Sequence, residues 1–292
     1  MRISLALTLI LLWRAASPGS VWFPASAGTQ HRYEVPATLE AIHRPFDELL
    51  DSNVRDGLVY YRALQSMRSR LDRYIASLDV PEATYAGWTR DRQIAFWLNA
   101  YNAFVLKTVI DRYPIRGKSE GYPANSIRQI PGAFDKLRHR AAGRSVTLDE
   151  IEKEVLPQFD DPRLYLALGR GAVGSGRLRS EAYSGAVLAE QLDSVAIDFL
   201  THQQMIRIDR ENDVISVTPI LSWREAEFVK AYDPGPVGPY ARRSPIERAM
   251  IAFVEPRVLP LEREFLQRNT FRFVFHDFDW RLNDLTGGRI DG

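Results

Sequence analysis

Residues 91–113 read DRQIAFWLNAYNAFVLKTVIDRY, and this stretch decides the fold. At 100° per residue, one broad helical face is apolar; it carries Ile94, Trp97, Leu98, Tyr101, Phe104, Val105 and Val109. Further apolar residues lie off that face, so we expect a helix that is buried on most sides. Asp91 is a suitable N-cap. Pro114 ends the helix because it disfavours the α conformation at the residue before it.

Two carboxamides, Asn99 and Asn102, interrupt this apolar helix three residues apart. A buried side-chain amide without partners costs about 1–3 kcal/mol, so both amides are expected to bond to neighbouring segments. We therefore predict that they are structural polar residues, which determine how the rest of the chain docks on the helix.

Composition indicates a globular protein and excludes several classes. The 292 residues are enough for a substantial core, and 45% hydrophobic with 26% charged residues is ordinary for a folded domain. With no cysteine, the chain has no disulfide, no thiolate metal site and no thiol nucleophile. The first 27 residues contain two of the 38 basic residues and no acidic residue, so the chain without them has 36 basic and 37 acidic residues. This balance counts against general nucleic-acid binding.

Residues 1–27 have the pattern of an export signal. Arg2 gives a short positive region, residues 3–13 give an apolar stretch too short to span a bilayer, and residues 25–27 form an A-x-A cleavage site. We expect cleavage to leave residues 28–292 as a single globular domain, periplasmic or secreted, without a transmembrane segment. An uncleaved anchor is the alternative, because the stretch before the cleavage site is long and contains an arginine.

Periodicity elsewhere predicts a helix-rich α+β domain around the central helix, with a small, mostly antiparallel sheet. Capping boxes at Thr147 and Ser244 open two of the helices. Other helices are expected at about 39–54, 62–78, 184–200 and 220–232. The expected strands are 58–61, a buried strand at 163–168, a hairpin of 205–209 with 214–218, and 271–275.

Several blocks, in order, resemble the domain-of-unknown-function 547 family. They are FWLNAYN at 96–102, LDEIE at 148–152, DPRLYLAL at 161–168, LR at 178–179 with Tyr183, SW at 222–223, and DWRLN at 279–283. The resemblance covers a core of about 49–228 and a C-terminal block at 271–284. It implies a shared fold and no particular reaction.

Family members usually carry histidines and cysteines at positions that read Lys153, Tyr165, Arg170 and Ser175 here. If the family uses a Cys/His pair as nucleophile and base, this chain has lost it. Serine needs a positioned base beside it, and a tyrosine with its ordinary pKa of about 10 is a poor base at neutral pH.

Three residues are candidates for catalysis. Ser175, between two glycines, is a candidate nucleophile, although an alanine replaces the first glycine of G-x-S-x-G and a plain loop serine is the simpler interpretation. Glu152 is a candidate base, or the structural partner of Asn102 or an arginine. His276 has two aspartates nearby, but without the spacing of a metal site. We predict no metal and no cofactor.

The glycine-rich loop 169–176 is surrounded by four arginines, namely Arg163, Arg170, Arg177 and Arg179. Guanidinium groups beside free backbone N–H groups suit a carboxylate or phosphate, so we predict that these arginines bind an anion. The alternative is that they form ordinary ion pairs. Four large aromatic residues are interpreted as core: Trp97, Tyr101, Trp223 and Trp280.

Two functions remain open. The first is a non-catalytic exported binding or scaffold protein, with an arginine-lined loop for an anionic small molecule or envelope component. The second is a cell-envelope hydrolase or acyl-transferase of papain-like type that uses Ser175. By fold analogy alone, a papain-like or transglutaminase-like core would place a nucleophile near the central helix. The substituted histidine and cysteine positions favour the first function.

Overall fold

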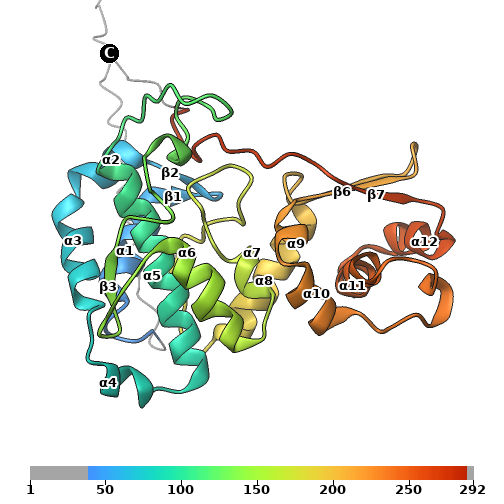
Figure 1. Ribbon diagram of the computed structural model, residues 1–292, viewed down its shortest axis with the longest axis horizontal. Coiled ribbons are helices and arrows are strands. Elements are labelled where there is room, and N and C mark those ends of the chain that lie inside the picture. Colours follow the sequence, from blue (N-terminus) through green and yellow to red (C-terminus); the bar gives the residue numbers. More distant parts are fainter. Residues whose placement is uncertain (1–38, 288–292) are drawn as a thin grey trace, which may run out of the picture. The chain divides into compact units, whose positions relative to one another are not determined.

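Helix α5 (Arg90–Ile110) lies at the centre of the helical part of the protein (Figure 1). The computed structural model describes residues 39–287, so the predicted signal peptide at 1–27 lies outside it. From Ile94 onward every residue of α5 except Lys107 is buried. The helix begins two residues earlier than expected: Thr89, rather than Asp91, is the N-cap, because its side chain accepts a hydrogen bond from the Arg92 N–H.

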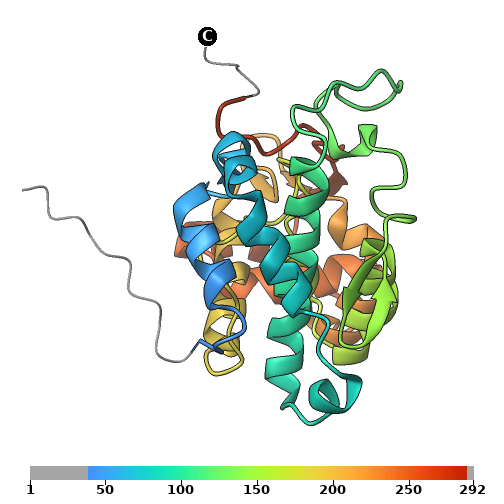
Figure 2. The same cartoon turned by 90° about the vertical axis from the view of Figure 1, so that its left-hand side faces the viewer.

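The elements before α5 form one side of its surroundings (Figure 2). They are α1 (Arg44–Asn53), β1 (Val54–Arg55), β2 (Leu58–Val59), α2 (Tyr61–Ser66), α3 (Arg68–Ser77) and α4 (Glu82–Ala86). Helices α2 and α3 pack directly on α5, and α1 packs on α3. The helix expected at 62–78 is thus two helices, which meet at Met67.

A second group of elements follows the loop after α5. It comprises β3 (His139–Ala141), β4 (Arg144–Val146), α6 (Leu148–Glu150), a π-helical turn (Ile151–Val155), α7 (Arg163–Leu166) and α8 (Leu188–Thr201). The capping box at Thr147 is confirmed: its side chain accepts from the Glu150 N–H, and the Glu150 carboxylate accepts from the Thr147 N–H.

The strand predicted at 163–168 is wrong, because residues Arg163–Leu166 form the short helix α7. A short apolar run does not distinguish a buried strand from a buried helix by periodicity. Just before the run, the Asp161 carboxylate accepts a hydrogen bond from the Arg163 N–H at 3.0 Å, a local turn of the kind aspartate favours, which leads into the helix.

The remaining elements build a three-stranded sheet and its flanking helices (Figure 1). They are β5 (Ile206–Asp209), β6 (Val214–Val217), α9 (Ile220–Trp223), α10 (Glu225–Tyr232), α11 (Pro245–Val254), α12 (Pro260–Arg268) and β7 (Arg272–Phe275). The hairpin of β5 with β6 and the capping box at Ser244 are confirmed. Strand β7 pairs with β6 in parallel. The helix-rich α+β class with small sheets is therefore confirmed.

The segment after β7 returns to the N-terminal hairpin, which is the antiparallel pair of β1 and β2. The Tyr61 hydroxyl donates to Asn283 Oδ1 at 2.7 Å, and the Val59 N–H donates to the Asn283 carbonyl at 2.8 Å. The Tyr113 hydroxyl, beyond α5, donates to Asp284 Oδ2 at 2.8 Å. Residues 171 or more positions apart in sequence therefore close the same part of the core. No helix among residues 39–287 is long and apolar enough to cross a membrane.

The two amides of α5 each make a pair of hydrogen bonds to a distant segment. Asn99 Nδ2 donates to the Tyr183 carbonyl and its Oδ1 accepts from the Tyr183 N–H, both at 2.8 Å. Asn102 Nδ2 donates to the Ala167 carbonyl at 3.3 Å, and its Oδ1 accepts from the Gly169 N–H at 2.8 Å. The segment that leaves α7 is thereby held against α5 by side chains.

Replacing Asn99 by alanine should destabilise the fold strongly. The change leaves the buried N–H and carbonyl of Tyr183 without their partners, at a cost on the order of 1–3 kcal/mol for each group. Urea unfolding measures the effect, with the exposed Asn212→Ala as the control, for which we expect a change within about 0.5 kcal/mol. Equal losses in the two variants would contradict the structural role of the amide.

Acid should weaken the fold through His43. Burial, followed by the charge of Arg92, lowers the pKa of His43 to about 3, and its Nδ1 bonds to the Tyr74 hydroxyl at 2.9 Å. Between pH 6.5 and pH 3 the His43 side chain is therefore protonated in the unfolded chain and neutral in the folded chain. The free energy of unfolding falls with decreasing pH there, by up to about 1.4 kcal/mol per pH unit. Urea titrations across this range should show a shallower slope for His43→Gln; an unchanged slope would contradict the assignment.

Candidate functional site

A buried ion pair between Glu152 and Arg170 lies at the centre of the candidate site. Arg170 Nη2 donates to Glu152 Oε1 at 2.8 Å and Nε donates to Oε2 at 3.2 Å, so the contact is bidentate. Arg170 is only 2% exposed. Arg224 Nη2 adds a bond to the same Oε1 at 3.1 Å, and the Tyr101 hydroxyl donates to Oε2 at 3.3 Å. One carboxylate thus receives donors from three segments.

Local sequence explains how these groups meet. The capping box at Thr147 starts the turn that carries Glu152, and the π-helical step over Ile151–Val155 shifts the direction of the side chains that follow. Arg170 comes directly after Gly169, which Asn102 holds. Arg224 stands at the break between α9 and α10.

The electrostatics of the cluster keep Glu152 ionised. Burial alone would raise its pKa, but Arg170 first and Arg224 second outweigh burial and lower the pKa of Glu152 to about 2. Burial lowers the pKa of Arg170, but the neighbouring Glu152 carboxylate outweighs burial and raises the pKa of Arg170 above its usual value. Burial also raises the pKa of Tyr165 well above 10. Neither Glu152 nor Tyr165 is therefore tuned to take a proton at neutral pH.

A cavity of about 360 Å³ opens over this ion pair. Its lining residues are Arg128, Phe134, Asp149, Glu152, Lys153, Arg170, Trp223, Arg224 and Trp280. Three of the cations are paired with carboxylates: Arg170 with Glu152, Lys153 with Asp149 at 2.6 Å, and Arg224 with both Glu152 and Glu227. The fourth, Arg128, makes no ion pair with any carboxylate of residues 39–287.

Aromatic rings form one wall of this cavity. The guanidinium carbon of Arg128 lies 4.4 Å from the ring centre of Phe134 and 4.3 Å from that of Trp280. Trp223 and Trp280 lie 6.4 Å apart at 19°, and Phe278 packs against both. Trp223 is 45% exposed, so the expectation that it is a core residue is wrong. Its position at the end of the short helix α9 leaves its indole at the cavity rather than in the core.

The four arginines predicted to bind an anion are not brought together. Arg163 pairs with Asp161 and Asp193, and Arg179 pairs with Glu181. Arg177 pairs with Asp56 at 2.7 Å and lines a different pocket, together with Arg179. Only Arg170 reaches the cavity described above.

Ser175 is buried, and its hydroxyl oxygen accepts a hydrogen bond from the Arg170 N–H at 3.0 Å. No histidine or carboxylate of residues 39–287 is hydrogen-bonded to it. The neighbouring glycines are required for packing: a Cβ on Gly176 would lie 1.6 Å from the Leu166 carbonyl oxygen, and one on Gly174 would lie 2.7 Å from the Asp279 nitrogen. Close backbone approach accounts for this loop without a nucleophile.

His276 follows the end of β7 and does not line the cavity over Glu152 and Arg170; its Nδ1 contacts the Asp277 carbonyl.

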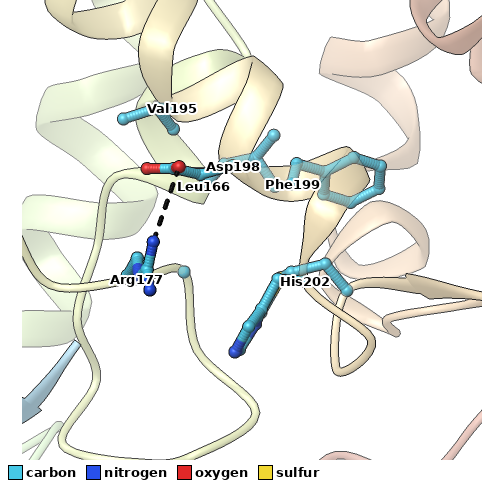
Figure 3. Close-up of a pocket in the computed structure, with 8 residues that line it drawn as sticks. Leu166, Arg177, Val195, Asp198, Phe199 and His202 are labelled. Carbon is cyan, nitrogen blue, oxygen red and sulfur yellow. Dashed lines mark ion pairs between the residues drawn. The ribbon is translucent and has the colours of Figure 1, made fainter. Parts of the chain in front are cut away.

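A further small cavity adjoins Gly176 (Figure 3). Arg177 there lies 3.8 Å from Asp198, and burial, with the charge of Arg177, lowers the pKa of His202. This second cavity has a volume of about 10 Å³ and admits a single water molecule at most, so it is not a ligand pocket.

Sequence reasoning missed Arg128, Arg224 and the exposed face of Trp223. Spacing could not find them, because the lining comes from segments more than 150 residues apart. The usable signal was the family resemblance, since residues 222–223 and 279–283 are two of its blocks.

Fold and site together define a helix-rich α+β protein with a charged, aromatic-walled pocket. Residues 85–200 match the model of a family described as "Protein of unknown function, DUF547", and this match supports assigning the chain to that family. The matched residues include Glu152 and Arg170, whereas Arg224 and Trp280 lie beyond them. No curated protein and no solved structure matches the chain.

Breaking the buried ion pair should cost more than breaking an exposed one. Arg170→Met leaves Glu152 buried with fewer donors, and we expect the free energy of unfolding to fall by about 3–5 kcal/mol. The double variant Arg170→Met with Glu152→Leu should recover much of that loss, because no uncompensated charge remains. The control Arg138→Met breaks an exposed bidentate pair with Glu150 and should cost far less. Urea unfolding of all variants tests this; a double variant as unstable as Arg170→Met would contradict it.

Proposed function

We propose that this protein is an exported, non-catalytic binding protein that takes a small anionic ligand in the cavity over the Glu152–Arg170 pair. The observation that carries the proposal is Arg128, the lining cation that no carboxylate of residues 39–287 neutralises. Arg128 is exposed, its guanidinium lies over the rings of Phe134 and Trp280, and its N–H donors face no carboxylate of the described residues.

Arg224 supplies a second donor. Its side chain is 11% exposed and lines the same cavity, where Nη2 donates to Glu152 and Nη1 to Glu227. A guanidinium has five N–H donors, so Nη1 and Nη2 each retain one N–H beside these contacts. Two guanidinium groups on one cavity suit a carboxylate or a phosphate better than a neutral group.

The geometry around Ser175 favours binding over hydrolysis. Its hydroxyl is engaged by the Arg170 N–H, and the nearby Glu152 has a pKa of about 2. A serine nucleophile needs a base that accepts its proton, and none is hydrogen-bonded to Ser175 in the described part of the chain. The hydrolase alternative therefore has no observation in its favour.

Export rests on the sequence alone. The positive residue Arg2, the short apolar stretch at 3–13 and the A-x-A site at 25–27 support it. The absence of cysteine is compatible with an oxidising compartment, since no thiol needs protection there.

Titration calorimetry with three simple anions tests the binding function. We expect citrate, benzoate or inorganic phosphate to bind, and Arg128→Gln to weaken that binding at least tenfold, because a charge-assisted hydrogen bond contributes about 1.5–3 kcal/mol. Arg242→Gln is the matched control: it removes an exposed arginine outside the cavity and should leave the affinity unchanged.

Two outcomes would overturn the proposal. One is that none of the three anions binds, and the other is that Arg128→Gln and Arg242→Gln weaken binding equally. Hydrolysis of an ester substrate that is abolished by Ser175→Ala would instead support the enzyme alternative.

A further inference from the structure

The cavity over Glu152 and Arg170 contains more than an anion site needs. Besides its cations, the lining has two carboxylates. Among residues 39–287, Glu152 already receives four donors, whereas Asp149 receives one, the Lys153 ammonium at 2.6 Å, and a carboxylate can accept more than one hydrogen bond. The lining therefore fits a ligand that combines an anionic group with several hydroxyl groups, because a hydroxyl can donate to a carboxylate and also accept from a guanidinium.

The aromatic wall indicates a ring in the same ligand. Trp223 is 45% exposed at the edge of the cavity, and Trp280 and Phe278 support it from one side. An indole face is large and flat, and its negative π-surface attracts polarised C–H groups as well as cations. A saturated sugar ring presents a face of such C–H groups, while its hydroxyls point outward toward polar partners.

The cavity size suits a ring of this kind. Its volume of about 360 Å³ is near the lower end of the range of about 300–1,000 Å³ for ligand pockets. It accommodates one sugar unit, with Trp223 and the ion pair both in its lining.

We propose that the ligand is a carboxylate-bearing sugar, bound with its carboxylate at Arg128 and Arg224 and with its ring against Trp223. This inference rests on the proposed binding function and names the ligand class for the same cavity. An aromatic acid is the competing class. It has the charge and the ring but no hydroxyl donor for Asp149.

Calorimetry with matched ligands tests the proposal on the full chain. Tetragalacturonate supplies the ring, the hydroxyls and the carboxylates; its methyl ester lacks the charge, and benzoate lacks the hydroxyls. We expect tetragalacturonate to bind at least tenfold more tightly than either. Trp223→Ala should weaken its binding at least tenfold, whereas Trp223→Phe should retain most of it. Leu261→Ala, which truncates an exposed apolar side chain outside the cavity, should change nothing.

The outcomes separate this inference from the proposed function. If benzoate or citrate binds through Arg128 but tetragalacturonate binds no better, the anion site stands and the sugar assignment is wrong. If the methyl ester binds as tightly as the acid, the carboxylate is not recognised and the assignment is also wrong. If Trp223→Ala binds tetragalacturonate like the unaltered protein, the indole is not part of the site.

Discussion

The hydrogen bonds of two carboxamides on α5 set the geometry on which the rest of the protein depends. Asn102 holds the Ala167 carbonyl and the Gly169 N–H against α5, and so it positions the backbone just before Arg170. The Arg170 guanidinium then reaches Glu152, which also accepts a hydrogen bond from Tyr101 of α5. An apolar side chain in place of Asn102 would leave two backbone groups unpaired in the core and the position of the arginine undetermined. The position of the Glu152–Arg170 ion pair thus depends on the hydrogen bonds that Asn102 makes.

Local signals predicted the parts of the fold that local energetics decide. The capping boxes at Thr147 and Ser244 and the β5–β6 hairpin follow from interactions between residues close in sequence. Helix α7 was missed because its apolar run fits either secondary structure, and the turn that Asp161 forms with the Arg163 N–H leads the chain into a helix. The start of α5 shifted for a similar reason: two suitable caps, Thr89 and Asp91, stand two residues apart.

The candidate site could not be predicted from spacing, because it is assembled by tertiary packing. Arginines that crowd one loop in sequence diverge in space, each toward the nearest carboxylate, as Arg163 does toward Asp161 and Arg179 toward Glu181. The residues that line the cavity come instead one or two at a time from segments that are far apart in the sequence. The four positions that depart from the family pattern were more informative. Arg170 donates to the Tyr165 carbonyl and the Ser175 hydroxyl, and Lys153 lines the same cavity, so these substitutions occupy one neighbourhood.

The return of residues 282–285 to the N-terminal hairpin has a consequence for how the protein reaches its native state. Val59 and Tyr61 are synthesised early, but their partner Asn283 is made more than 200 residues later. Contacts so far apart in sequence form slowly, because a long loop must close before they contribute. The edge of the β1–β2 hairpin therefore lacks this partner until residue 283 has been synthesised.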